Sequence, residues 1–352
     1  MAKIAVLGDS HFGMRNDNKR ILEFQCKFYE EQFFPYLEKN GITEIIQTGD
    51  FFDNRKYIAM PTLAAARKYF IDPCIEKNIK VKVIAGNHDL PYRYNNSCSS
   101  VKQLLEDIEN FQIFENEIHE DEHGIKYYPW ISPSNKEEFL KDLKKGGSIC
   151  VGHFETSSFL MEGGHLCDKG TTELKDFKKF DLVISGHFHH RSKNKNLNYV
   201  GVPYEMSFND CEQIKGFHIL DTETKKMEFI PNEEKLFFSY NINSEKETDI
   251  SNLKENSFVR MRILENNNPH ETGKLISKIN FLDPYDFKII DKTIEKYSSN
   301  NVEEILNLKS TEDLIVEYVN EIAEDHKMKD EISETCLLIH EMAKERQQEL
   351  QK

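Results

Sequence analysis

Short apolar segments alternate with helical stretches through the first two-thirds of this chain, and this order limits the fold more than any other feature. The segments with β-strand character are residues 3–7, 44–48, 81–85, 149–151 and 182–185. Apolar residues at helical spacing predict helices over residues 18–40, 61–78 and 101–108. Strands that alternate with helices in this way are typical of an α/β layered domain.

Carboxylate, amide and imidazole side chains follow each of these five strands. They are Asp9 and His11, Asp50 and Asp53, Asn87, His88 and Asp89, His153, and His187, His189 and His190. Ligands of α/β sheets bind outside the carboxyl ends of the strands, so the five loops can converge in space. The set has no thiolate, which favours Mn²⁺, Fe²⁺ or Zn²⁺. It holds more candidates than one ion needs, and a shared carboxylate can bridge two cations.

Each of these short motifs is weak evidence when it stands alone. A Gly-Asp pair after a strand is usually a turn, and Gly86-Asn87-His88-Asp89 could be a loop that caps itself with its own side chains. In this order, and each time after an apolar strand, the motifs together predict a metal centre.

The composition excludes several classes of protein. The formal net charge of −15 argues against a general polyanion binder. Seven cysteines, odd in number and without a CxxC pair, indicate reduced thiols and neither a disulfide framework nor a thiolate metal site. No apolar run is long enough to cross a bilayer, and the chain enters a strand without a signal peptide, so we expect a cytoplasmic protein.

The chain of 352 residues is long enough for two or three domains. A boundary is predicted near residue 232, followed by a small α/β unit with a strand at 257–264, a helix at 269–279 and a strand at 287–290. Residues 301–352 carry 14 Asp or Glu against 6 Lys or Arg, and two amphipathic helices are predicted there. We therefore expect three regions, at residues 1–232, 233–297 and 298–352.

The five loop motifs resemble those of the calcineurin-like metallophosphoesterase superfamily over about residues 1–230. The resemblance implies a layered β-sandwich flanked by helices, and two metal ions that share Asp50. The implied ligands are Asp9, His11, Asp50 and His189 for the first ion, and Asp50, Asn87, His153 and His187 for the second. It further implies that His88 protonates the leaving oxygen or steadies the charged transition state, and that Asp89 orients His88.

Within that superfamily the motifs GDFFDNR and GNHD differ from the GDxxDRG and GNHE of protein phosphatases. The layout resembles the nuclease subunit of double-strand-break repair complexes, nearest to its T-even bacteriophage members. This resemblance implies a Mn²⁺-dependent DNA exonuclease and endonuclease in recombination, repair and replication, with Mg²⁺, Fe²⁺ or Zn²⁺ as alternative metals. For a phage protein the compartment would be the host cytoplasm.

The same resemblance implies partners and regional roles. Residues 233–297 would be a DNA-recognition capping domain, and the C-terminal helices would dock a coiled-coil ABC-type ATPase. A homodimer would form through residues 61–78 and 101–108, with Leu63, Tyr69, Phe70 and Leu104 as interface or core residues. Many members of this nuclease branch have histidine where Asp53 stands. Asp53 instead matches the GDxxD pattern of the broader superfamily, and it is expected to support a metal ligand or a neighbouring loop.

The sequence alone leaves alternatives open for the function, for the C-terminal helices and for His190. The same metals would serve a phosphatase or cyclic phosphodiesterase acting on small substrates, and a catalytically silent scaffold would retain the fold alone. The C-terminal helices could pack back on the parent domain. His190 is either a residue of the cleft or an exposed spare histidine.

Overall fold

The computed structural model describes residues 2–159, 166–243, 248–264 and 268–293, together with Val319, Lys329 and residues 332–340. The chain divides into two compact units. The first contains Met1–Arg262 and Asn268–Ile290, and the second contains Ile263–Asn267 and Asp291–Lys352. Most of the predicted C-terminal helices lie outside the described residues, and residues 332–340 are helical.

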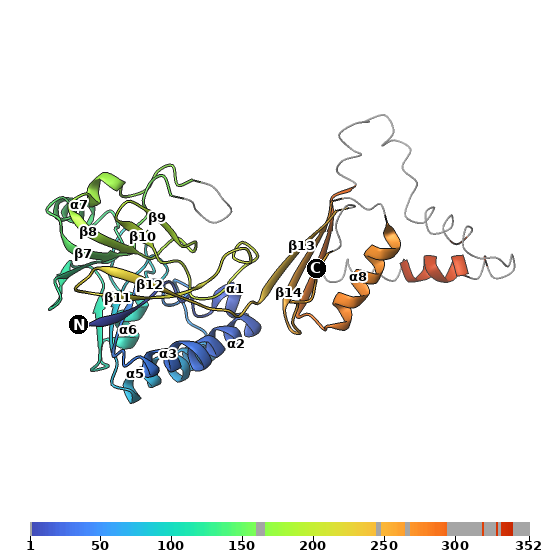
Figure 1. Ribbon diagram of the computed structural model, residues 1–352, viewed down its shortest axis with the longest axis horizontal. Helices are drawn as coiled ribbons and strands as arrows, with labels where there is room; N and C mark the ends of the chain where they lie inside the picture. The colour runs from blue at the N-terminus through green and yellow to red at the C-terminus, as the bar shows by residue number, and fades with distance from the viewer. Residues whose placement is uncertain are drawn as a thin grey trace. The chain divides into compact units, whose positions relative to one another are not determined.

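Two six-stranded sheets form the centre of the first unit (Figure 1). The first sheet has the order β12 (Lys226–Pro231), β11 (Gly216–Asp221), β1 (Lys3–Leu7), β2 (Glu44–Gln47), β3 (Lys80–Ile84) and β4 (Phe111–Phe114). The second has the order β5 (His119–Glu120), β6 (Ile125–Tyr128), β7 (Gly147–Gly152), β8 (Phe180–Ser185), β10 (Leu197–Tyr199) and β9 (Ser192–Asn194). Strands β1 to β4 run parallel to one another, as do β6 to β8.

The two sheets pack face to face, and β1 shows how the sequence produces this. Ile4 and Val6 belong to the apolar cluster between the sheets, which also contains Ile149 of β7. Ala5 and Leu7 point to the opposite face and join the cluster beneath the helices. Because successive side chains of a strand alternate between faces, a strand covered on both sides must be apolar throughout.

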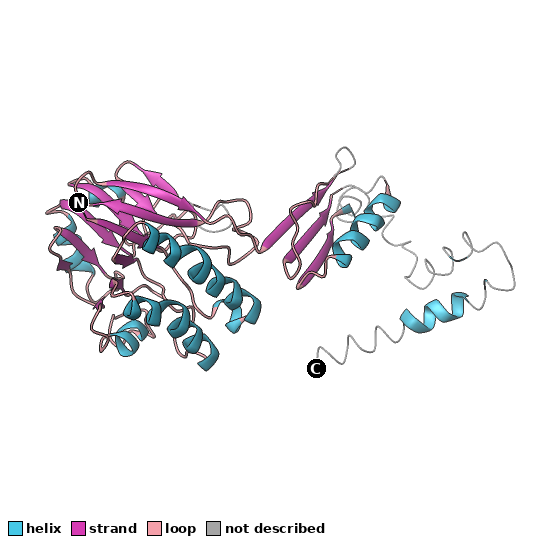
Figure 2. Ribbon diagram, turned by 60° about the horizontal axis from the view of Figure 1, so that its bottom comes forward, coloured by secondary structure: helices cyan, strands magenta, loops and turns pink. Residues whose placement is uncertain are grey.

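Helices cover the outer faces of both sheets (Figure 2). They are α1 (Met14–Asp17), α2 (Lys19–Phe28), α3 (Phe34–Lys39), α4 (Met60–Ala66), α5 (Asp72–Glu76), α6 (Ser100–Leu105) and α7 (Lys136–Leu143), with a 3₁₀ turn at Leu174–Phe177. The helices predicted over 18–40 and 61–78 are each interrupted by a π-helical turn, at Tyr29–Phe33 and Arg67–Ile71. Phe70 is fully buried in the core, so it is unavailable to an interface; Leu63, Tyr69 and Leu104 pack against the same core and are partly buried.

A third sheet follows, with the order β13 (Phe237–Ile242), β14 (Phe258–Ile263) and β15 (Asp286–Asp291), and it is accompanied by α8 (Pro269–Phe281). The buried carboxylate of Glu205 accepts the backbone N–H groups of Leu236 and Phe237, each at 2.8 Å. Phe237 also packs its ring against Phe208 at 5.1 Å. These contacts fix the start of β13 against the β-sandwich.

The predicted fold class is therefore confirmed, as a layered β-sandwich flanked by helices with a small α/β unit after it. Sequence analysis found β1, β2, β3, β7 and β8 within two residues of their observed ends. It did not identify β4, β5, β6, β9 or β13.

Candidate metal centre

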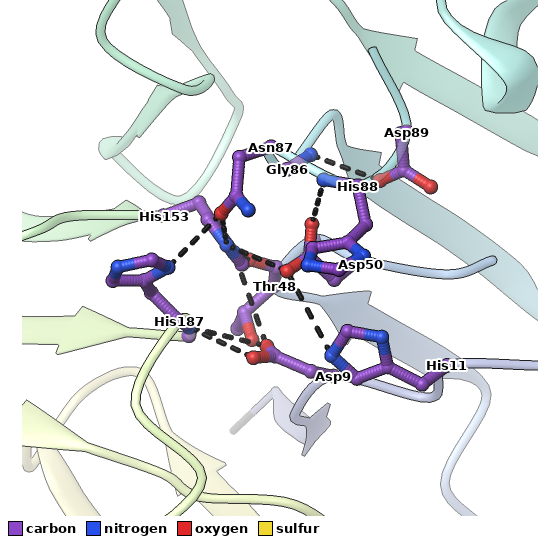
Figure 3. A network of polar contacts seen from close by, with 12 residues as sticks. Asp9, His11, Thr48, Asp50, Gly86, Asn87, His88, Asp89, His153 and His187 are labelled. Carbon is purple, nitrogen blue, oxygen red and sulfur yellow. Dashed lines mark hydrogen bonds and ion pairs between the residues drawn. The ribbon is translucent and has the colours of Figure 1, made fainter. Parts of the chain in front are cut away.

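The predicted ligands come together because their strands are neighbours. Asp9, Asp50 and Asn87 follow the parallel strands β1, β2 and β3 of the first sheet. His153 and His187 follow β7 and β8, which pair in parallel in the second sheet. The carboxyl ends of both sets meet at one edge of the sandwich, and Figure 3 shows their side chains converging there.

One group of potential ligand atoms comes from Asp9, His11 and His189, which lie close enough to hold one metal ion. The Nε2 atoms of His11 and His189 are 3.2 Å apart. Asp9 is buried, and its Oδ2 accepts the backbone N–H of His187 at 2.9 Å. This group therefore ties the loop after β1 to the loop after β8.

A second group consists of Asp50, His153 and His187. His153 Nε2 lies 3.2 Å from Asp50 Oδ2 and 3.0 Å from Asn87 Oδ1. His187 Nδ1 is also 3.0 Å from Asn87 Oδ1, which brings the amide into the same cluster. Four side chains from four strand ends thus present oxygen and nitrogen atoms to one small volume.

Asp50 joins the two groups (Figure 3). Its Oδ2 atom lies 3.2 Å from His153 Nε2 and 3.8 Å from His11 Nε2. Its Oδ1 atom accepts the backbone N–H of His88 at 2.6 Å, which holds the carboxylate in place. A carboxylate between two groups of nitrogen ligands is the arrangement that lets one residue bridge two cations.

The imidazoles are oriented through their second nitrogens. His153 Nδ1 donates to the backbone oxygen of Thr48 at 2.8 Å, which leaves its Nε2 toward Asp50. His11 Nδ1 lies 3.0 Å from Asp53 Oδ1, which leaves its Nε2 toward His189. Histidines that bind metals are commonly fixed in this way by a carboxylate or a carbonyl on the opposite ring nitrogen.

The backbone is unusual at the same residues. His11, Asp50 and His187 all have positive φ angles, of 45°, 52° and 87°. Such conformations are uncommon for residues other than glycine, and they concentrate at functional sites. Gly49, with φ of 112°, precedes Asp50, and a side chain there would collide with the ring of His153. The sharp turn after β2 therefore requires glycine.

The buried acidic charges favour positive charge in this pocket. Burial lowers the pKa of His11 and of His153, but nearby carboxylates outweigh it and raise both to about 9. Burial raises the pKa of Asp50, yet the neighbouring His153 holds it well below its usual range. Burial and the positive His153 lower the pKa of His187 to about 3. A pocket of this charge, with oxygen and imidazole donors only, fits divalent cations.

His88 is partly exposed beside these groups, and its ring centroid is 4.8 Å from that of His11. Its Nδ1 lies 2.6 Å from the backbone oxygen of Asp53, and 4.0 Å from the Asp53 carboxylate. Asp53 thus contacts both His11 and His88, and its support of a metal ligand or a neighbouring loop stays a prediction.

The Asp89 carboxylate binds backbone N–H groups, and its expected role in orienting His88 stays a prediction. Asp89 is fully buried and accepts backbone N–H groups from Phe51 at 3.0 Å and Gly86 at 2.9 Å, with Phe52 at 3.3 Å. Burial and the charge of Asp50 raise its pKa to about 7. Asp89 therefore connects the loop after β3 to the loop after β2, and the partner of His88 is a backbone carbonyl.

His190 takes no part in these groups among the described residues. Its Nε2 lies 3.2 Å from the backbone oxygen of Asn209, so it braces a neighbouring loop. Sequence analysis missed Trp130, whose ring centroid is 5.2 Å from that of His187 and 5.9 Å from that of His153. It also missed Glu155, whose Oε1 is 4.0 Å from His187 Nε2. Trp130 follows β6, and identifying that strand would have placed it at the same sheet edge.

The fold and the donor set define a metallophosphoesterase. The chain belongs to the calcineurin-like phosphoesterase family, whose model matches residues 2–191. The predicted superfamily and the prediction of a metal-dependent phosphodiesterase are thereby confirmed. The family implies a divalent metal, and the residues present fit one. The assignment of each ligand to a particular ion stays a prediction.

Two of the proteins that this chain resembles are named as nuclease subunits, and a third is named as a DNA repair protein. Exonuclease subunit 1 of Enterobacteria phage T4 is 31% identical over 324 residues, covering 91% of this chain and 93% of the relative. A subunit of the SbcCD nuclease of Staphylococcus epidermidis is 26% identical over 261 residues, covering 64% and 67%. The DNA double-strand break repair protein Mre11 of Methanocaldococcus jannaschii is 26% identical over 232 residues, covering 61% of each chain.

Among the helices that the structure describes, none combines the length and the apolar character that crossing a bilayer requires.

Proposed function

We propose that this protein is a DNA exonuclease and endonuclease that hydrolyses phosphodiester bonds with a pair of Mn²⁺ ions, in DNA recombination and repair. The observation that carries the proposal is the position of Asp50 between two groups of nitrogen ligands, 3.2 Å from His153 and 3.8 Å from His11. The 31% identity to a phage exonuclease subunit over nearly the whole length of both chains, with the 26% identity to a DNA double-strand break repair protein, supports DNA as the substrate.

The ligand assignment follows the two groups of side chains. Asp9, His11, Asp50 and His189 would hold one ion, and Asp50, Asn87, His153 and His187 would hold the other. Such a pair supplies an activated water and neutralises charge on the phosphate during in-line displacement. The protein's own part is to fix these donors through the carbonyl of Thr48 and the carboxylate of Asp53.

His88 would act as the general acid. The carbonyl of Asp53 holds the proton on its Nδ1. In the imidazolium form the ring also carries a proton on Nε2, which it can donate to the leaving oxygen, and the partly exposed ring can meet a substrate. Asp89 contributes by fixing the loop that carries His88, since it ties that loop to Phe51.

The test is cleavage of end-labelled linear DNA, duplex and single-stranded, in the presence of Mn²⁺. Wild-type protein should cut, and Asp50→Asn and His88→Ser should both lose the activity. Hydrolysis of a small phosphate ester without any DNA cleavage would instead indicate a phosphatase or cyclic phosphodiesterase. Native mass spectrometry that finds no bound metal in saturating Mn²⁺ would indicate a silent scaffold.

We further propose a role for each of the three regions of the chain and an ATPase as the partner. We assign residues 1–232 to the nuclease, 233–297 to DNA recognition, and 298–352 to binding a coiled-coil ABC-type ATPase in the cytoplasm. Two of the relatives are named as subunits of a nuclease, which supports a multisubunit assembly. Deleting residues 301–352 should abolish ATPase binding and spare Mn²⁺-dependent cleavage; full binding by the truncated chain would contradict the assignment.

A homodimer would form through residues 61–78 and 101–108, which contain α5 and most of α4 and α6. Met60 at the start of α4 and Ile75 in α5 are largely exposed, in contrast to Phe70, and can serve as contacts. Light scattering should give twice the chain mass for wild type and a lower mass for Met60→Glu combined with Ile75→Glu. A monomeric wild type at working concentrations would contradict the dimer.

A further inference from the structure

Two loops that continue from the metal-binding loops carry exposed tyrosines. Tyr57 follows Asp53 on the loop after β2, and Tyr92 and Tyr94 follow His88 and Asp89 on the loop after β3. Tyr57 is 61% exposed, Tyr92 50% and Tyr94 61%. The rings of Tyr92 and Tyr94 lie 5.6 Å apart at an angle of 32°, so they form one exposed aromatic surface.

The backbone beneath this surface is fixed on both sides. On one side, Asp89 uses its carboxylate to bind Phe51 and its carbonyl to accept the N–H of Ser100 at 2.8 Å. On the other side, Asn96 donates its side-chain amide to the backbone oxygens of Trp130 at 2.7 Å and Glu115 at 3.1 Å. The tyrosines are thus presented from an anchored loop, which lowers the entropy lost when a ligand binds them.

Two arginines lie in the same two loops. Burial lowers the pKa of Arg55; nearby Asp50 raises it, while the positive Arg93 lowers it further. Arg55 follows Asp53 by two residues, and Arg93 lies between Tyr92 and Tyr94 in the sequence. Neither forms an ion pair with a carboxylate among the described residues, although the chain carries a net charge of −15. A guanidinium group without a carboxylate partner is suited to a phosphate, which it binds through two parallel hydrogen bonds.

We propose that Tyr92 and Tyr94 stack against an unpaired base of the substrate, while Arg55 and Arg93 hold a phosphate of the same strand beside the metal centre. This rests on the proposed nuclease function and adds that the strand is bound single-stranded where it is cut. A base inside a duplex has both faces covered by its neighbours. An aromatic platform therefore selects bases at a frayed end, a gap or a single strand.

A second copy of this chain is the competing occupant of the aromatic surface. A twofold interface would place the same patch against itself. The arginines beside the tyrosines would then face their own copies, and like charges close together repel. A nucleic acid strand offers both a π-face for the tyrosines and negative charge for the arginines, so it satisfies both features together.

The test combines Tyr92→Ala with Tyr94→Ala and compares this variant with the matched Tyr92→Phe, Tyr94→Phe variant. Substrates are a single-stranded oligodeoxynucleotide and a blunt duplex containing the same strand, each with Mn²⁺. Stacking contributes about 1–3 kcal/mol per base, so the alanine variant should raise KM for the single strand about tenfold or more. The duplex should be affected less, and the phenylalanine variant should keep wild-type values. Calorimetry with Mn²⁺ verifies that each variant retains its metal sites.

A binding measurement checks the stacking directly. A strand carrying 2-aminopurine as its terminal unpaired base, without added metal, should lose fluorescence on binding wild type and the phenylalanine variant, but not the alanine variant. An unchanged KM and unchanged quenching in the alanine variant would overturn the proposal, as would a change from dimer to monomer in light scattering with DNA cleavage intact. Absence of DNA cleavage by wild type would instead overturn the nuclease function itself.

Discussion

His88 Nδ1 lies 2.6 Å from the backbone carbonyl oxygen of Asp53, so the loop after β3 is held directly by the loop after β2. A carbonyl oxygen only accepts hydrogen bonds, and Nδ1 must therefore carry the proton. The ring presents its other nitrogen, Nε2, away from this contact. The orientation of the proposed acid is thus set by the main chain and is independent of which side chain occupies position 53.

Replacing His88 should impair the reaction without removing the metals. His88→Ser takes away the proposed acid, and general acid catalysis typically contributes about 10²–10⁴-fold to a rate. We expect kcat for DNA cleavage to fall within that range while Mn²⁺ stoichiometry by calorimetry is unchanged. Loss of a bound ion in this variant would mean that His88 serves the metal centre itself.

The Asp53 side chain should act through His11. Asp53→Ala keeps the carbonyl that holds His88 and removes the carboxylate 3.0 Å from His11 Nδ1. Loss of such a partner typically weakens metal binding by about 10–100-fold. The single tryptophan, Trp130, packs on His187 and His153, so its fluorescence offers a titration of Mn²⁺ binding.

The matched control for that titration is Asp53→Asn, which retains an oxygen acceptor for His11 and should lose less affinity. Wild-type affinity in Asp53→Ala would show that His11 needs no partner. A pH dependence of kcat that changes in Asp53→Ala, with metal saturating, would contradict the separation of the two roles of residue 53.

Most of the site could be predicted because ligand residues after adjacent strands share a sheet edge. What escaped prediction involves backbone atoms. The partner of His88 is the backbone carbonyl of Asp53. Every residue has such a carbonyl, so the residue type does not reveal the contact. The same holds for Asp89, whose partners are N–H groups of Phe51, Phe52 and Gly86. Asp89 follows His88 in sequence, yet its side chain points to the neighbouring loop.

The fold likewise has parts that the sequence predicts and parts that it does not. The strand predicted at 149–151 extends over Gly147–Gly152, because Gly147 pairs with Phe180 and Gly152 with Ser185 in the neighbouring strand. Pairing extends a strand through glycines that carry no hydrophobic signal. The helix predicted over 18–40 is divided at Tyr29–Phe33 by a π-helical turn, and the Tyr29 hydroxyl reaches Ser10 beside the metal loop. Helical periodicity alone does not reveal that interruption.

Asp89 should be important for stability. Asp89→Ala leaves three backbone N–H groups without their acceptor, two of them on the loop that carries Asp50. Each buried unsatisfied donor costs roughly 1–3 kcal/mol, and partial rearrangement limits the total to roughly 2–4 kcal/mol. The free energy of unfolding by urea, measured with a chelator present, should fall by this amount.

The control for Asp89 is Asp89→Asn, which keeps one acceptor oxygen at the same position. It should be destabilised less than the alanine variant. If both variants unfold at the wild-type urea concentration, the Asp89 carboxylate does not stabilise the connection between the two loops in solution.

His218 makes folding stability depend on pH, and it does so independently of the metal centre. It is a buried residue of β11, with its ring 5.1 Å from that of Phe229. Burial, aided by the positive charge of Arg191, lowers its pKa from 6.5 to about 4. Between these two values the unfolded chain binds a proton at this position that the folded chain does not. Folding stability therefore falls as the pH falls from 6.5 towards 4.

Replacing His218 should remove that part of the acid sensitivity. A shift from 6.5 to about 4 corresponds to about 3 kcal/mol at pH 4, and none of it is present above pH 7. The difference in unfolding free energy between wild type and His218→Gln should therefore move in favour of the variant as the pH drops from 7 to 4.5. His270→Gln, on the exposed first turn of α8, is the matched control for replacing a histidine outside the core. Parallel profiles for wild type and His218→Gln would mean that His218 accepts a proton in the folded protein as readily as in the unfolded chain.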